Sequence, residues 1–158
     1  MADETQMVVF KLIGDNTVCE YGIPITQVQE IIPMAQPTRL PQTPDFVEGV
    51  INLRGRIIPI IDIKKRFNMG SSEITSETRS VVVDVENSTV GIIVDEVSEV
   101  LRLPASSIEP PPVVMGGITA EYLTGIGKLE DRLLVLLDMN KILNEGERAE
   151  LAAIKDRR

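Results

Sequence analysis

The segment from Gly49 to Asp62 returns without a gap as the segment from Gly125 to Asp138, at a constant offset of 76 residues. Both copies contain, in order, a glycine, an apolar run, a turn, an arginine, a second aliphatic run and an aspartate. Aliphatic runs resemble one another by chance, but the matched glycine, leucine, arginine and aspartate favour duplication. The chain is therefore expected to fold as two similar units.

A second pair of segments extends this repeat. Thr17-Val18 and Thr89-Val90 begin comparable apolar strands, and each strand leads into the pattern Val-x-Glu-(Ile/Val), at Val28 and at Val97. Closing a sheet of such residues into a barrel removes the exposed edges that a flat sheet presents. The repeat predicts a mainly β fold of two small β-barrels packed back to back.

Period-two alternation of apolar residues locates the strands. Because only 3% of the residues are aromatic, the core must consist of isoleucine, valine and leucine, which favour strands. The predicted strands are Met7–Ile13, Val18–Ile23, Val50–Leu53, Ile57–Ile61, Ser80–Val85 and Thr89–Val94.

Helical signals are short. Thr26 and Gln29 form a capping-box pattern, which predicts a helix over Ile25–Ile32 that ends at Pro33. Asp62 is a suitable N-cap for one further helical turn. The other predicted helical segments are residues 43–49 and residues 140–158.

The net charge of −8 argues against nucleic acid or an anionic membrane as the main partner. The first residues, MADETQ, lack the basic and apolar regions of a signal peptide, and apolar runs stay far below the roughly 20 residues that span a bilayer. We therefore expect a cytoplasmic protein that does not insert into the membrane directly.

Few residues are suited to catalysis. The chain has no histidine and a single cysteine, Cys19, so we expect no metal site, no cofactor and no enzymatic activity. The remaining alternative is a small carboxylate-based hydrolase that uses Asp95, Glu96 and Glu99. Solvated charges on an outer face explain these acids better.

The turn in the first copy of the repeat carries the strongest binding signal. Gly55 allows the positive φ of a tight hairpin, Asn52 can bond the backbone, and Arg54 then stands at a rigid tip. Arg54 and Arg56 could merely keep the hairpin soluble, or their guanidinium groups could bind a carboxylate on a partner. The second copy has Glu130 in place of Arg54, so the turn itself does not require arginine.

Four segments resemble the CheW family of bacterial chemotaxis coupling proteins. They are EGVINLRGRIIPIIDIKKRF (Glu48–Phe67), YGIPITQVQEII (Tyr21–Ile32), VGIIVDEVSEVL (Val90–Leu101) and EYLTGIGKLEDRLLVLLDMNKIL (Glu121–Leu143). The resemblance runs in order from Thr5 to Glu145. It implies two SH3-like five-stranded barrels on a shared core, with short helices and a C-terminal helix.

The implied organisation is a tail over residues 1–6 and one CheW-like domain over residues 7–155. The two barrel halves are expected at residues 7–78 and 79–143, and the C-terminal helix at about residues 140–155.

The resemblance also implies a function. Relatives are non-enzymatic adaptors that link the histidine kinase CheA, through its regulatory domain, to the cytoplasmic helical tips of chemoreceptors at the inner face of the membrane. Arg54, Glu30 and Val28 match family positions implicated in signalling or coupling, and Arg56 stands where many relatives have an uncharged residue. An adaptor of the same family in another signalling pathway, such as surface motility, is the alternative that the sequence leaves open.

Overall fold

The computed structural model describes most of the chain. The described part comprises residues 4–14, 18–34, 36–41, 43, 45–67, 74–85, 88–110, 114–115, 118–119, 123–130 and 132–142.

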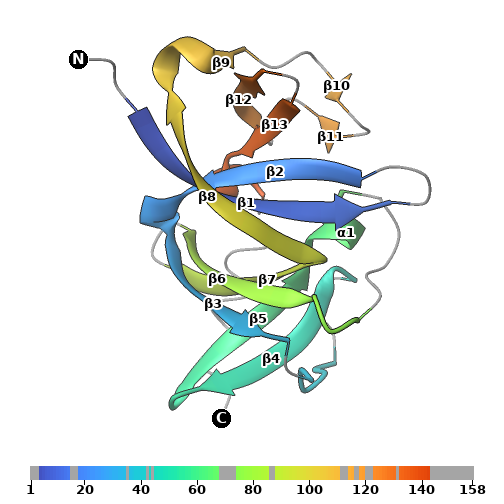
Figure 1. Ribbon diagram of the computed structural model, residues 1–158. Coiled ribbons are helices and arrows are strands. Elements are labelled where there is room, and N and C mark those ends of the chain that lie inside the picture. The colour runs from blue at the N-terminus through green and yellow to red at the C-terminus, as the bar shows by residue number, and fades with distance from the viewer. Residues whose placement is uncertain are drawn as a thin grey trace.

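Two large sheets dominate the part of the chain that the structure describes, and Figure 1 shows one above the other. The upper sheet has the order β8-β1-β2-β13-β12-β9, and its strands are β1 (Glu4–Ile13), β2 (Val18–Pro24), β8 (Glu96–Pro104), β9 (Ile108–Glu109), β12 (Leu123–Leu129) and β13 (Arg132–Leu137). The lower sheet has the order β3-β6-β7-β5-β4, and its strands are β3 (Val28–Pro33), β4 (Val47–Leu53), β5 (Arg56–Asp62), β6 (Arg79–Val85) and β7 (Ser88–Val94). A separate two-stranded sheet pairs β10 (Val114–Met115) with β11 (Ile118–Thr119). The prediction of a mainly β fold with two SH3-like units is confirmed.

The two repeats exchange strands between these sheets. The first repeat supplies β1 and β2 to the upper sheet and β3, β4 and β5 to the lower sheet. The second repeat supplies β6 and β7 to the lower sheet and β8, β12 and β13 to the upper sheet. The predicted barrel halves at residues 7–78 and 79–143 are therefore wrong as barrels, because each barrel contains strands from both repeats.

A short connection explains the exchange. Pro24, at the end of β2, lies opposite Met7 of β1, whereas the strand on the other side of β1 begins opposite Lys11. Those four residues of β1 correspond to about 13 Å along the strand. The three-residue 3₁₀ helix η1 (Ile25–Gln27) advances only about 6 Å. The chain cannot return beside β1, and the other side of β2 is paired with β13. β3 therefore pairs with β6 in the other sheet.

Several predicted boundaries also change. β1 begins at Glu4, because Glu4, Thr5 and Gln6 pair with β8, so these residues are not a tail. The upper sheet has six strands where five were expected, because the two-residue β9 pairs with β12. Residues 45–46 form a turn before β4, and not a helix. Of the C-terminal helix, only the 3₁₀ helix η4 (Met139–Lys141) and Ile142 fall within the described residues.

The predicted helix over Ile25–Ile32 is wrong beyond its first turn. Only η1 is helical, and Val28–Pro33 form β3, which pairs with β6. The β-branched residues of this segment suit a strand, and pairing with β6 outweighs the local capping-box pattern. Gln29 is the extra residue of a β-bulge, because Val28 lies opposite Val83 and Glu30 lies opposite Val82.

Most of the long strands contribute to two cores. One core lies inside the upper sheet, one lies inside the lower sheet, and a third core is shared between them. Along β1, Met7 and Val9 belong to the upper core, whereas Val8, Phe10 and Leu12 belong to the shared core. Because the shared core includes β1 and β2 together with β6 and β7, it holds the two sheets as one unit.

Gly49 shows why the repeat retains a glycine at this position. Its φ is +143°, and a Cβ added there would lie 2.2 Å from the carbonyl oxygen of Thr38. Thr38 exchanges two backbone hydrogen bonds with Val50, at 2.8 and 2.9 Å. At the equivalent Gly125, a Cβ would lie 2.9 Å from the carbonyl oxygen of Glu109 in β9. Both glycines let a neighbouring segment lie directly against the strand.

A buried ion pair links the two sheets. Lys64 belongs to the helix α1 (Ile63–Arg66), and its Nζ lies 3.3 Å from Oδ2 of Asp95, with side-chain exposures of 6% and 8%. The same Oδ2 accepts a 2.7 Å hydrogen bond from the backbone N–H of Ile13, and the Asp95 N–H donates to the Lys11 carbonyl at 3.1 Å. The helix itself begins as predicted, because Asp62 accepts from the Lys64 N–H at 3.1 Å.

We predict that Asp95→Ala lowers the free energy of unfolding by about 3–5 kcal/mol, because it leaves the Lys64 ammonium buried without a counter-charge. Urea denaturation measures this change. Glu96→Ala is the matched control, since the Lys11–Glu96 pair is more exposed, and its cost should stay below about 1 kcal/mol. Equal small losses for both variants would show that the buried pair does not hold the sheets together.

Candidate partner-binding surface

The β4–β5 turn has the geometry that the sequence predicts. Arg54 and Gly55 both have positive φ values, 52° and 86°, as in the tight turns that suit a twisted hairpin. The Gly55 N–H donates to Oδ1 of Asn52 at 2.8 Å, which fixes the loop. Glu130, at the equivalent position of the β12–β13 turn, has a φ of 39°. A non-glycine residue thus occupies the left-handed region at both turn tips.

Arg54 and Glu30 form an ion pair with each other. Nη2 of Arg54 contacts Oε2 of Glu30, so the hairpin tip is tied to β3. The Arg54 side chain is nevertheless 69% exposed, against 28% for Glu30. The structure therefore brings two predicted binding residues together and leaves most of the guanidinium open to solvent.

Val28 does not join this exposed pair. It is half-buried and packs against the shared core, next to the bulge at Gln29. The neighbouring exposed apolar residue is Ile31, at 39% exposure. The short helix that was to carry Val28 and Glu30 is a strand, and its bulge at Gln29 separates the two side chains. Val28 lies opposite Val83, which belongs to the shared core, whereas Glu30 lies opposite Val82, which belongs to the lower core.

Arg56 takes part in a polar network on the lower sheet. It donates from Nη1 to Oε1 of Gln29 at 3.2 Å and from Nη2 to Oγ1 of Thr89 at 3.0 Å. Nε2 of Gln29 donates to Oδ1 of Asp84 at 2.6 Å. Sequence reasoning missed Gln29, Asp84 and Thr89. No pattern in the sequence indicates their contacts, because these join residues from distant segments.

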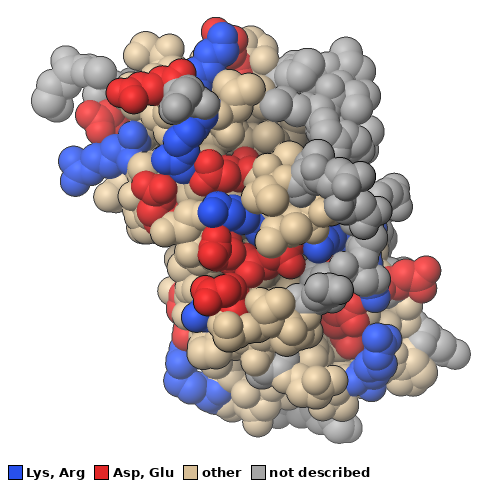
Figure 2. Space-filling model, turned by 45° about the vertical axis from the view of Figure 1, so that its right-hand side comes forward, with Lys and Arg blue, Asp and Glu red and all other residues tan. Residues whose placement is uncertain are grey.

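The upper sheet has a more highly charged version of this network. Arg132, the repeat counterpart of Arg56, contacts Glu20 at 3.1 and 2.7 Å and Glu99 at 3.3 Å. The hydrogen bond to Glu20 raises the pKa of Arg132, so the guanidinium stays charged. Lys11 and Glu96 pair alongside at 3.1 Å. Acidic and basic side chains are interleaved over the face that Figure 2 shows.

The three candidate hydrolase acids have separate structural partners. Asp95 pairs with Lys64, Glu96 pairs with Lys11, and Glu99 pairs with Arg132. Asp95 is buried, whereas the other two acids lie on the surface of β8. The three carboxylates do not converge on one site, so the carboxylate-pair hypothesis has no geometric support.

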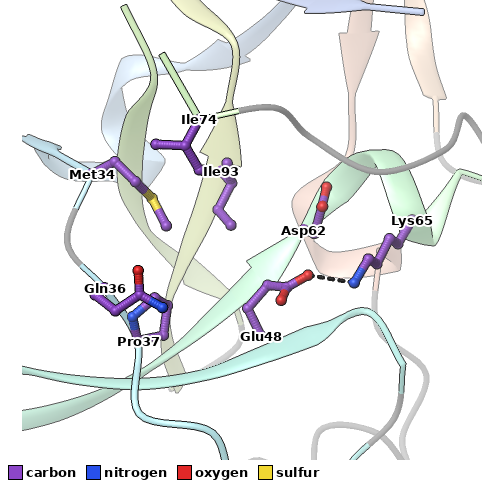
Figure 3. A pocket seen from close by; sticks show the side chains of 8 residues that line it. All are labelled: Met34, Gln36, Pro37, Glu48, Asp62, Lys65, Ile74 and Ile93. Atoms are coloured by element: carbon purple, nitrogen blue, oxygen red, sulfur yellow. Dashed lines mark ion pairs between the residues drawn. The ribbon is translucent and has the colours of Figure 1, made fainter. Parts of the chain in front are cut away.

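A small pocket of about 220 Å³ opens beside the lower sheet. Figure 3 shows Met34, Ile74 and Ile93 on one side and the Glu48–Lys65 ion pair, at 2.6 Å, on the other. Asp62, also in the lining, caps α1. The charged groups of this pocket thus serve the packing of α1 against β4 and β5. Among the described residues, no cluster of histidine, cysteine, aspartate and glutamate could hold a metal ion.

We predict that Arg54→Gly leaves the free energy of unfolding unchanged or raises it by up to about 1 kcal/mol. Glycine adopts a positive φ without the steric strain that a side chain causes there. The loss of the exposed Arg54–Glu30 ion pair costs less than about 1 kcal/mol of stability. Chemical denaturation checks this, with Glu130→Gly as the control at the equivalent turn. A loss above about 2 kcal/mol at Arg54 alone would assign Arg54 to fold stability.

Comparison with known proteins places the chain in a family. A family model described as CheW-like domain matches residues 6–147. The chain is 45% identical over 130 residues to chemotaxis protein CheW of Klebsiella aerogenes, covering 82% of this chain and 78% of that protein. Its identity to chemotaxis protein CheW of Bacillus subtilis is 39%, over 89% of this chain and 87% of the relative.

A solved structure agrees with the fold. The crystal structure of the scaffolding protein TtCheW from Thermoanaerobacter tengcongensis superposes with a TM-score of 0.81 at 35% identity, over 93% of this chain and 92% of that one. In the part of the chain that the structure describes, no helix is both long and apolar enough to cross a membrane. The family match, the relatives and the shared fold agree, and the chain belongs to the CheW-like family of chemotaxis coupling adaptors.

Proposed function

We propose that this chain is a non-enzymatic adaptor that binds the regulatory domain of the kinase CheA and the cytoplasmic helical tips of chemoreceptors. Through the receptors it would be held at the inner face of the membrane and would let receptor state control kinase activity. The observation that carries the proposal is Arg54, an exposed side chain on a rigid turn that pairs with Glu30 of β3. The residue after Glu30 in the same strand is the exposed Ile31.

The chemistry of this surface suits a protein partner. Arginine presents several donors in a fixed plane, and it binds a carboxylate in two-pronged fashion better than lysine does. Glu30 already occupies one side of the guanidinium, so Arg54 is oriented before a partner arrives. An apolar residue beside a charged rim is the usual composition of a specific interface.

The equivalent end of the upper sheet supports a role in bridging. Glu130 stands where the lower sheet has Arg54, and the exposed Val100 and Leu133 lie on β8 and β13 beside the Arg132–Glu99 pair. The two ends therefore have related shapes and opposite charge at the turn tip. A chain with two different ends can contact two different neighbours, as a head-to-tail assembly requires.

Receptor control of the kinase follows from linkage. A receptor tip changes kinase activity through this adaptor only if its contacts differ between signalling states. We assign the receptor contact to the apolar region between the two barrels, following the family resemblance, and the kinase contact to the surface formed by Arg54, Glu30 and Ile31.

We predict that Arg54→Glu weakens binding to the regulatory domain of CheA at least tenfold, because it removes the guanidinium donor and places a second carboxylate beside Glu30. The melting temperature should stay nearly unchanged. Isothermal titration calorimetry measures the affinity. Arg102→Glu is the matched control, since it makes the same charge change at an exposed position of β8. If both variants bind as tightly as the parent, Arg54 is not the kinase contact and the proposal fails.

A further inference from the structure

Four polar side chains lie in a row across the lower sheet, at the end where the β4–β5 turn lies. They are Gln29 of β3, Asp84 of β6, Thr89 of β7 and Arg56 of β5. Besides the three bonds described above, Gln29 Nε2 lies 3.3 Å from Oγ1 of Thr89, and Oγ1 of Thr89 lies 3.4 Å from Oδ1 of Asp84. This group, which we call the polar strap, ties four neighbouring strands together.

The polar strap is attached to the bulge of β3. Gln29 is the bulged residue, so it has no partner residue opposite it in β6. Its side chain fixes its position, with its carbonyl oxygen on Arg56 and its amide nitrogen on Asp84. Glu30 follows immediately and holds Arg54. The conformation at Gln29 therefore determines where the Glu30 carboxylate points.

The upper sheet repeats this arrangement with different side chains. Arg132 is offset from Arg56 by the 76 residues of the repeat, and it contacts Glu99 of β8. The residue before Glu99 is Ser98, which is again the bulged residue, because Val9 lies opposite Glu99 and Phe10 lies opposite Val97. Arg56, the first residue of β5, and Arg132, the first residue of β13, thus each contact the strand that carries the bulge, β3 and β8 respectively. In both barrels this arginine makes its contacts within the chain.

We infer that Arg56 is a positioning residue for the kinase-binding surface and not itself a contact of the partner. It holds the bulge at Gln29, which keeps Glu30 aimed at Arg54 and so orients the Arg54 guanidinium. This revises the sequence-based assignment of Arg56 as a binding residue. The inference rests on the proposed function only in naming Arg54 as the kinase contact.

The first test needs no partner. Arg56→Met keeps a long side chain and removes all five donors. We expect hydrogen exchange of the β3 amides at Gln29 and Glu30 to speed up at least tenfold, while the core amides of β6 and β7 keep their rates. Arg132→Met is the matched control, and its faster exchange should appear in β8 around Ser98 and not in β3. Unchanged exchange in β3 after Arg56→Met would overturn the inference.

The second test separates positioning from direct contact. Alone, Arg56→Met should weaken binding to the regulatory domain of CheA about three- to tenfold. In the Arg54→Ala background it should add less than a twofold loss, because Arg56 acts through Arg54. The same loss in both backgrounds would make Arg56 a direct contact and contradict the inference. If Arg54→Ala alone leaves binding intact, the proposed function fails, while the exchange measurement still decides whether Arg56 holds the bulge.

Discussion

The short connection between β2 and β3 is the constraint on which the rest of the structure depends. In the first repeat a three-residue 3₁₀ helix cannot carry the chain back along β1, and in the second repeat the single residue Asp95 joins β7 to β8. The third strand of each repeat therefore finds its partners in the other sheet. The exchange places β1, β2, β6 and β7 back to back and produces the shared core. Neither repeat can then complete a barrel alone. The buried Lys64–Asp95 pair adds a polar contact to this largely apolar junction, which also contains the stacked rings of Phe10, Tyr21 and Phe67.

This architecture also determines what the surface can do. The interior of each barrel is filled by apolar side chains, so most charged groups lie on the surface, including the rims that carry the turn tips. There they are occupied by ion pairs and hydrogen bonds within the chain, and Arg54 keeps most of its guanidinium in solvent. Such a rim can bind a partner protein through a complementary shape and complementary charges. The two rims differ because Arg54 is replaced by Glu130, and because Arg132 contacts Glu20 where its counterpart Arg56 contacts Thr89. A duplicated fold thus presents two distinct ends.

Local signals in the sequence were sufficient for the local features. The matched glycines, the Arg54-Gly55 tip, the bond from Asn52 and the cap at Asp62 follow from residue type and spacing alone. The exchange of strands was missed because it depends on the reach of a connection, which composition does not show. For the same reason Ile25–Ile32 was predicted as a helix, since its capping pattern is local and its pairing with β6 is not. The contacts of Gln29 with Asp84 and Arg56 join residues from distant segments, and no single-sequence pattern indicates them.

The central claim is that neither repeat is a folding unit, because each barrel and each rim is built from both. The most direct test is to produce residues 1–78 and residues 79–158 as separate chains and to measure circular dichroism and cooperative unfolding for each chain and for the mixture. We predict that neither fragment unfolds cooperatively alone and that mixing restores a cooperative transition. A cooperative native-like transition in either isolated fragment would contradict the strand exchange and the shared origin of the binding surface.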